Sequence, residues 1–516
     1  MVKALTGKTY RECQRSLGLF ILEKRRMRGD LISAYNFLDG GKGEGGAALL
    51  CLVRKGMRKW NEAVSGLDIR KSFFIQRLMQ NTSENPKEYL VNHVNRKFLG
   101  CFRTMDTLNK ANTSFALDFF KQQCQEDGDK NILFSPWSIS SALATVHLGA
   151  KGNTADQMAK VLHFNKAEGA KNVTTTIRMH VYSRTEQSQS NQRACFQKTE
   201  IGKSDNIHNG FKALSFEINQ PTKNYLLKSV NQLYGEKSLP FSKEYLLLAK
   251  RYYSVEPQAV DFVGAADAIR REINSSVEQQ TEGKIQNMLP SGSVDSLTRL
   301  VLINALYFKG NWATNFEAEA TRPRPFRINM HTTKPVPMMY LRDKFNLNYI
   351  ESVQADVLEL PYVNNDLSMF ILLPSDISGL QKLERELTFE NLSVWTKPEL
   401  MEKMNVEVYL PRFTLEEKYD LKSTLSRMGI QDAFTEGQAD FTAMSKTGDL
   451  FLSQVFHKCY LEVNEEGTEA AAASSATLAS RSLGATVIFL ADHPFLFFIR
   501  HNKTKTILFL GRFSSP

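Results

Sequence analysis

The stretch NEEGTEAAAASSATLASRS, at residues 464–482, is the most informative feature of the sequence for the fold. An acidic turn is followed by small residues from Ala470 to Ala476, and a single arginine, Arg481, comes near the end. The flanks are strongly apolar, with FLSQVFHKCYLEV before the stretch and VIFLADHPFLFFIRH after it. This layout suits a loop that is exposed in one state and buried as a strand in another, because small side chains fit easily between existing strands.

Around this stretch, the apolar patterns predict helices and strands without strict βαβ alternation, which favours an α+β fold. Residues 105–123 have the spacing of an amphipathic helix, and SPWSISSALATVHLGA predicts a buried helix capped by Ser135, with Pro136 at its first position. Strands are predicted for LTRLVLINALYFKGNW, LSMFILLP, VEVYLPRFTLE, VFHKCYLEV and TILFLGRF. The polar residues 165–205 predict a long loop between two helices.

The positive charge of the chain is concentrated at its N-terminus. Residues 1–104 contain 20 Lys and Arg against 9 Asp and Glu, an excess larger than the net charge of +10 of the whole chain, so residues 105–516 are close to neutral. The first 104 residues also lack sustained apolar periodicity. We therefore expect a basic, poorly ordered N-terminal extension at 1–104 and a main domain at 105–516.

The sequence offers little support for an enzyme or a metalloprotein. It has no HExxH, no GxSxG and no GxGxxG after a strand, and its nine histidines are dispersed. The six cysteines form no CxxC pair, and their scarcity suggests a reducing compartment. No run of 18 apolar residues and no signal peptide is evident. No metal, cofactor or membrane span is therefore expected.

Six segments, in order along the chain, resemble the motifs of the serpins, and specifically of the ovalbumin-type (clade B) intracellular serpins. They are FSPWSISSAL, LVLINALYFKGNW, LSMFILLP, VEVYLPRFTLE, NEEGTEAAAA and ADHPFLFFIRHNKTKTILFLGRF. The resemblance covers residues 105–516 and does not extend to the N-terminal extension. It implies a serpin fold of three β-sheets and about nine helices, with an exposed reactive-centre loop at 465–490.

The resemblance also implies a mechanism, in which a serine protease attacks the loop as a suicide substrate and forms an acyl-enzyme. The loop then inserts as a new strand into the central sheet and traps the protease. Counting fourteen residues from the hinge Gly467 gives Arg481, so the predicted cleaved bond is Arg481–Ser482. An arginine there fits a protease of the trypsin-like class. The plainer interpretation is a solvated arginine in an exposed loop.

Insertion requires small side chains on the face that becomes buried. Alternation along a strand places Thr468, Ala470, Ala472 and Ser474 on one face, and all four are small and uncharged. Each could enter the sheet without desolvating a charge. The resemblance assigns the hinge to Glu465, Gly467, Thr468, Ala470, Ala472 and Ser474.

The resemblance further implies a buried hydrogen-bonded cluster, the shutter, beneath the central strands. The matching residues are Ser135, Ser138, Asn304 and His457. The alternative for His457 alone would be a satisfied core histidine. Trp312 and Glu465 match positions at the breach, the end of the sheet where insertion begins.

Two classes of function remain open at this point. The first is an intracellular inhibitor that forms a covalent complex with a trypsin-like serine protease. The second is a non-inhibitory serpin that acts as a binding protein, with chromatin association as one form of it. Nucleic-acid binding is disfavoured because Glu and Gln dilute the basic residues of 165–205. A cytoplasmic monomer is expected, with the nucleus, or release without a cleaved signal peptide, as alternatives.

Overall fold

The computed structural model of the protein describes residues 86–167, 204–465 and 486–516. The larger of its two compact units comprises Arg103–Pro516, close to the domain boundary expected between residues 104 and 105. Helix α5 (Pro86–Asp127) begins earlier than the amphipathic helix expected from residue 105. None of the described helices is long and apolar enough to cross a membrane.

The central element is a five-stranded sheet in the order β10-β11-β4-β2-β3. Its strands are β2 (Tyr225–Glu236), β3 (Gln258–Val260), β4 (Leu300–Gly310), β10 (Phe413–Asp420) and β11 (Leu452–Val463). The pairs β10–β11 and β2–β4 are antiparallel, whereas β11–β4 and β2–β3 are parallel. The sheet is therefore mixed, with one parallel contact at its centre.

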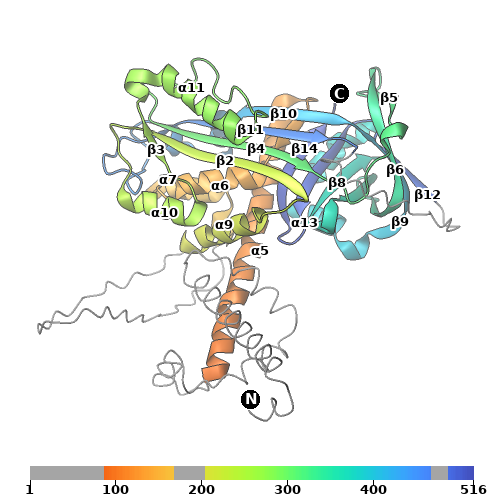
Figure 1. Ribbon diagram of the computed structural model, residues 1–516, viewed down its shortest axis with the longest axis horizontal. Helices are drawn as coiled ribbons and strands as arrows, with labels where there is room; N and C mark the ends of the chain where they lie inside the picture. The colour runs from red at the N-terminus through yellow and green to blue at the C-terminus, as the bar shows by residue number, and fades with distance from the viewer. Residues whose placement is uncertain (1–85, 168–203, 466–485) are drawn as a thin grey trace, which may run out of the picture. The chain divides into compact units, whose positions relative to one another are not determined.

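Strand β4 is buried on both faces because helices cover the sheet from both sides. Leu302, Leu306 and Phe308 point into the main core, whereas Val301 and Ile303 belong to a second cluster on the opposite face. Figure 1 shows helix α11 (Phe262–Gln280) over one face of the sheet and helix α6 (Pro136–His147) on the other. We call the side of α6 the inner face and the side of α11 the outer face.

Helix α6 starts as the sequence predicts. Ser135 is the N-cap, and its hydroxyl accepts a hydrogen bond from the backbone N–H of Ser138. Pro136 occupies the first helical position, where its missing N–H removes no helical bond. This capping fixes Ser135 and Ser138 directly beneath the central sheet.

The other nine strands form one hydrogen-bonded network. The long strand β6 joins its two parts, because one segment of β6 pairs with β9 and another pairs with β7. The path is β1-β14-β13-β8-β7-β6-β9-β12, with β5 pairing β6. Met338–Leu347 of β6 pair with β9, whereas Asn346–Ile350 pair with β7. Dividing the network at this point gives the two smaller sheets that, with the central sheet, make up the expected three. The strands are β1 (Ile132–Phe134), β5 (Arg322–Arg327), β6 (Thr333–Ile350), β7 (Ala355–Pro361), β8 (Leu367–Pro374), β9 (Glu402–Pro411), β12 (Thr486–Leu490), β13 (Phe495–His501) and β14 (Thr506–Phe513).

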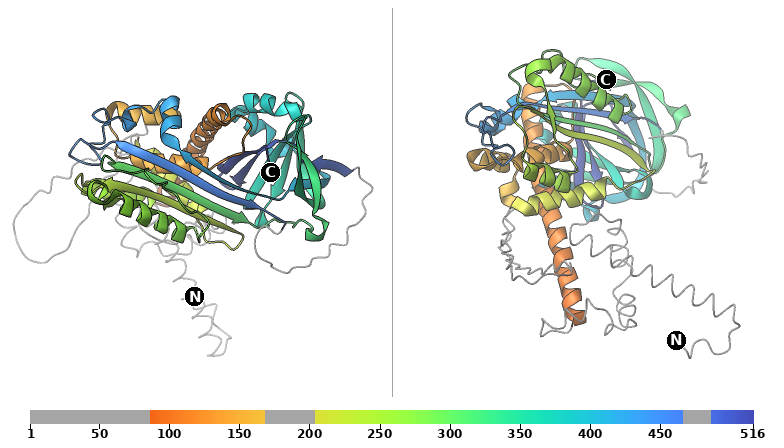
Figure 2. Two further views of the ribbon diagram at one scale, coloured as in Figure 1. Left: turned by 90° about the horizontal axis from the view of Figure 1, so that it is seen from above. Right: turned by 60° about the vertical axis from the view of Figure 1, so that its left-hand side comes forward.

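The remaining helices surround these sheets, as the two views of Figure 2 show. They are α7 (Gly152–Val161), α8 (Phe164–Ala167), α9 (Ser204–Ile218), α10 (Lys243–Tyr253), α12 (Leu380–Glu386), α13 (Phe389–Trp395) and α14 (Leu421–Met428). Most of the loop expected at 165–205 lies outside the described residues, between α8 and α9.

One strand prediction was wrong. The segment VEVYLPRFTLE was expected to be a single strand, but it contributes to β9 and to β10, which lie in different sheets. Pro411 ends β9, and the N–H of Arg412 donates to the carbonyl of Pro337, at 2.8 Å. Phe413 then starts a new ladder opposite Val463. Proline has no amide hydrogen with which to continue a ladder, so the chain changes sheets here.

Candidate functional site

The central site is the boundary between β4 and β11, which we call the seam. The two strands are parallel, with Val455 opposite Leu302 and Leu461 opposite Phe308. The chain leaves β11 after Val463 and continues into the stretch at 464–482. A segment that turned back from this end would run antiparallel to both β11 and β4. A strand inserted in the seam would therefore replace one parallel contact by two antiparallel ones, which pair slightly better.

A buried hydrogen-bond network joins the two sides of the seam to helix α6. The Nδ1 atom of His457 on β11 lies 2.6 Å from Oδ1 of Asn304, its direct partner on β4. The side-chain amide of Asn304 donates to the hydroxyl of Ser138 at 2.6 Å, and the backbone N–H of Ser135 donates to Nε2 of His457 at 3.1 Å. The structure thus brings together all four residues that were expected in the shutter.

The network fixes His457 in its neutral form. Burial, which disfavours the charged imidazolium, lowers the pKa of His457 to about 3. Because Nε2 accepts the Ser135 N–H, Nδ1 must carry the proton and donate it to Asn304. A second group contacts Nε2, the thiol of Cys459, at 3.0 Å. Burial raises the pKa of this thiol well above its ordinary value, so it stays protonated and donates.

The breach lies at the end of β11 from which the chain continues into 464–482. The indole N–H of Trp312 donates to the carbonyl of Asn464 at 2.9 Å, and its ring stacks on Tyr362 at 4.4 Å between centroids. The Oε1 atom of Glu465 accepts a bond from the hydroxyl of Thr321, at 2.8 Å, and lies 3.4 Å from Nη1 of Arg412. These contacts hold Asn464 and Glu465, the first two residues of the stretch at 464–482, against the sheet.

On the outer face, the segment that links α11 to β4 passes over the seam, and we call residues 281–299 the strap. The ammonium of Lys284 lies 5.8 Å from the ring centroid of Tyr307 on β4 and 5.4 Å from that of Tyr460 on β11. Tyr307 and Tyr460 are direct partners across the seam. The strap is also bound to β11 by Lys458, whose ammonium donates to the carbonyl of Gln286 at 2.8 Å.

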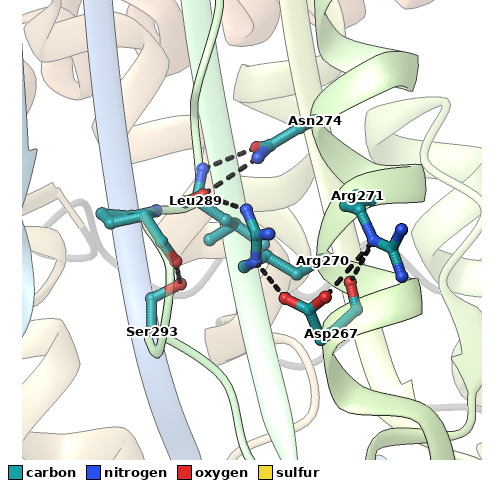
Figure 3. A network of polar contacts seen from close by, with 7 residues as sticks. Asp267, Arg270, Arg271, Asn274, Leu289 and Ser293 are labelled. Carbon is teal, nitrogen blue, oxygen red and sulfur yellow. Dashed lines mark hydrogen bonds and ion pairs between the residues drawn. The ribbon is translucent and has the colours of Figure 1, made fainter.

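Helix α11 contacts the strap at several points, and its polar contacts converge on the buried residue Leu289. Figure 3 shows Asn274 bonded to both backbone groups of Leu289, at 2.7 Å to its N–H and 2.9 Å to its carbonyl. Arg270 also donates to this carbonyl, at 3.3 Å, and is itself paired with Asp267 at 2.9 Å. Opening the seam therefore requires the strap, and with it α11, to accommodate a wider sheet.

The remaining predicted residues lie outside the described part of the chain. They are the hinge residues Gly467, Thr468, Ala470, Ala472 and Ser474 and the reactive bond Arg481–Ser482. Glu465 is the one hinge residue whose contacts can be given. Within the described ranges, no group of three His, Cys, Asp or Glu side chains could hold a metal ion.

Sequence reasoning missed three residues that complete the site: Cys459, Thr321 and Arg412. Cys459 could have been found, because it lies two residues after His457 and so points to the same face of the strand. Thr321 and Arg412 reach Glu465 from distant parts of the chain. The residues around Thr321 and Arg412 in the sequence do not predict these contacts.

Comparisons with known proteins agree with this geometry. The profile of the family described as "Serpin (serine protease inhibitor)" matches residues 110–516. The chain is 50% identical over 412 residues to Serpin B10 of Papio anubis, and 50% identical over 418 residues to plasminogen activator inhibitor 2 of Homo sapiens. In each case 80% of this chain and 100% of the relative are covered. Among solved structures, uncleaved ovalbumin matches with a TM-score of 0.68 and 36% identity, over 79% of this chain and 100% of ovalbumin.

These matches span all of the relatives and nearly all of the larger unit of this chain, and the described elements have the expected α+β arrangement around a central sheet. The chain therefore belongs to the serpin family, in its ovalbumin-type (clade B) group.

Proposed function

We propose that this protein inhibits a trypsin-like serine protease by offering Arg481–Ser482 as the bond to be cleaved and by inserting residues after Gly467 into the seam. The observation that supports this most strongly is the parallel contact of β4 and β11 at the centre of the sheet, because the chain passes from the end of β11 at Val463 directly into the stretch at 464–482.

The chemistry belongs to the protease. Its serine Oγ loses a proton and attacks the carbonyl carbon of Arg481, the bond to the Ser482 nitrogen breaks, and this nitrogen takes up a proton and becomes a new amino terminus. Residues 486–516 stay in the fold, because β12, β13 and β14 are paired with neighbouring strands. The acyl-enzyme is then joined to the end of a free segment that follows β11. This serpin needs no catalytic residue of its own for these steps.

Insertion then moves the protease along the sheet. Strands β4 and β11 contain 11 and 12 residues, so the seam accepts about eleven residues of an inserted strand. At roughly 3.3 Å per residue, the inserted strand would be about 36 Å long, and it would draw the acyl group towards the far end of the sheet. Deacylation requires an intact oxyanion hole and an activated water, and distorting the protease removes both.

The shutter and the breach set the barrier to this movement. The 2.6 Å bond between Asn304 and His457 crosses the seam, so a strand inserted there must break it. The contacts of Glu465 with Thr321 and Arg412 must likewise yield when the hinge enters the sheet. We assign these residues the role of holding the sheet closed until cleavage releases the loop.

Mixing the purified protein with trypsin tests the proposal. We expect a complex that survives SDS, with the bond Arg481–Ser482 cleaved and the protease inactive. The Arg481→Ala variant should form no such complex with trypsin while keeping the same thermal stability. Clean cleavage after Arg481 with full recovery of protease activity would contradict the proposal and favour a binding function.

We further propose that the protein acts as a cytoplasmic monomer and that residues 1–104 are an extension outside the inhibitory domain. Cell fractionation and sedimentation of the natural protein test the first point. The mass of that protein shows whether the extension is retained. A variant that lacks residues 1–85 should inhibit trypsin as fast as the full chain does.

A further inference from the structure

The outward face of β6, β9 and β12 is not used in the proposed trapping step, and β12 begins four residues after Ser482 in the chain. On β9, buried Val406 and Val408 alternate with side chains that point outward. Directly opposed residues of neighbouring strands share a face of the sheet. The opposed pairs are Tyr340–Tyr409, Arg342–Glu407, Lys344–Asn405, Thr486–Asn405 and Ile488–Glu407. Figure 1 shows these strands side by side, with β5 beside β6.

We call seven residues of this surface the docking face: Arg324, Tyr340, Arg342, Lys344, Lys403, Tyr409 and Ile488. Its aromatic part is ordered by direct contacts. The guanidinium of Arg324 lies 4.2 Å from the ring centroid of Tyr409, and the rings of Tyr409 and Tyr340 are 5.1 Å apart. Side chains that already contact one another in this way lose little conformational freedom when a partner binds.

Two further features make the docking face suited to a protein partner. Ile488 is 64% exposed and lies directly opposite Glu407, so it offers an apolar contact beside the charged residues. Arg342 is held by the hydroxyl of Thr486 at 3.2 Å and by Glu407 at 3.4 Å, so its position is fixed next to Ile488. An apolar centre with charged and aromatic neighbours is typical of protein interfaces.

The charge of this surface is positive. It carries four positively charged side chains, which are Arg324, Arg342, Lys344 and Lys403. Its negatively charged side chains are Glu407 and, near Tyr340, Glu317. Lys344 and Lys403 are exposed, and neither side chain forms an ion pair with a described residue. A partner with an acidic surface would therefore be attracted before contact.

The chain itself brings a protease to this surface. Ser482 precedes Thr486, the first residue of β12, by four residues. Four residues span at most about 14 Å, which is shorter than the width of any protease domain. A protease bound at Arg481–Ser482 must therefore stand over or directly beside the docking face.

We propose that the docking face is a second contact surface for the target protease and that it selects proteases with an acidic surface beside the active-site cleft. This inference rests on the proposed inhibition through Arg481. The face acts on the encounter, because complementary charge raises association rates. It takes no part in strand insertion, which occurs at the seam in the other sheet.

Charge reversal tests the proposal. The double variant Lys344→Glu, Lys403→Glu is compared with the unmodified protein and with Lys446→Glu, an exposed lysine that precedes β11 at the opposite end of that strand from Val463. The association rate constant and the stoichiometry of inhibition are measured with an anionic and a cationic trypsin, because both share the same cleavage preference. Thermal unfolding checks that every variant is folded.

We expect the double variant to associate about tenfold more slowly with anionic trypsin at low ionic strength, with unchanged stoichiometry. The difference should shrink to less than twofold in 0.5 M salt, since salt screens exposed charges. With cationic trypsin the double variant should be as fast as the unmodified protein or faster. Lys446→Glu should behave as the unmodified protein with both enzymes.

Equal rates for the double variant and Lys446→Glu with anionic trypsin at low salt would overturn the proposal. A change of oligomeric state with unchanged rates would also overturn it, because the face would then serve a second copy of this chain. If the unmodified protein formed no SDS-stable complex with either trypsin, the proposed inhibition would fail. The docking face could then still be judged by the rate of cleavage at Arg481–Ser482, so the two failures are distinguishable.

Discussion

Replacing Asn304 by alanine should weaken the closed sheet by a predictable amount. The substitution removes two buried bonds of 2.6 Å, to Ser138 and to His457, which together contribute about 2 kcal/mol. It also leaves the Nδ1–H of His457 without a partner in a fully buried place, which adds about 2 kcal/mol. The expected loss is about 4 kcal/mol.

This loss translates into a measurable shift of the thermal transition. A unit the size of Arg103–Pro516 has an unfolding entropy of about 0.9 kcal/mol per kelvin, so about 4 kcal/mol corresponds to a Tm lower by about 4–5 °C. Differential scanning calorimetry of the uncleaved protein, in the full chain, measures it.

Asn231 provides a matched control for this variant. It lies directly opposite Asn304 on β2, but its Oδ1 has no hydrogen-bond partner. Asn231→Ala should therefore lower the Tm by less than about 1 °C. If Asn304→Ala and Asn231→Ala gave equal shifts, the inferred contribution of the bonds across the seam would be refuted.

Three further predictions concern the hinge, the breach and the response to acid. Ala472→Glu should turn the inhibitor into a substrate, because insertion would bury a carboxylate, and the stoichiometry of inhibition should rise. Ala471→Glu places the carboxylate on the opposite face of the strand and should leave the stoichiometry nearly unchanged. Glu465→Ala should lower the Tm by about 2 °C, since about 2 kcal/mol is lost with its Thr321 and Arg412 contacts; no shift would show that the breach is held by other groups. Stability should fall as the pH drops from about 6.5 towards 3, because the unfolded chain protonates His457 more readily than the folded protein, in which its pKa is about 3. The slope is about 1.4 kcal/mol per pH unit for this histidine, and a His457→Gln variant that kept the full slope in urea titrations would contradict the assignment.

Local sequence patterns correctly predicted those helices and strands whose formation depends on residues close together in the chain. LSMFILLP and TILFLGRF form β8 and β14 with the same bounds, and Ser135 caps α6, because burial, alternation and capping act over a few residues. The four shutter residues were predicted through the family resemblance, and the structure brings them together.

Features that depend on contacts between distant segments could not be predicted in the same way. The change of sheet at Pro411 follows from the pairing of Phe413 with Val463, fifty residues later. The strap crosses the seam because Lys284 meets two tyrosines from different strands. A sequence pattern describes one segment at a time, whereas these features depend on tertiary contacts between segments.

The accessibility of the Cys459 thiol to a chemical reagent should report how often the seam opens. In the closed sheet the sulfur is fully buried and bonded to His457, so a thiol reagent cannot reach it. We expect the sulfur to become reachable when the seam opens, because its partner His457 bonds across the seam to Asn304. The rate of alkylation at Cys459, measured by mass spectrometry against the partly exposed Cys124, would therefore count opening events that leave no change in the average structure.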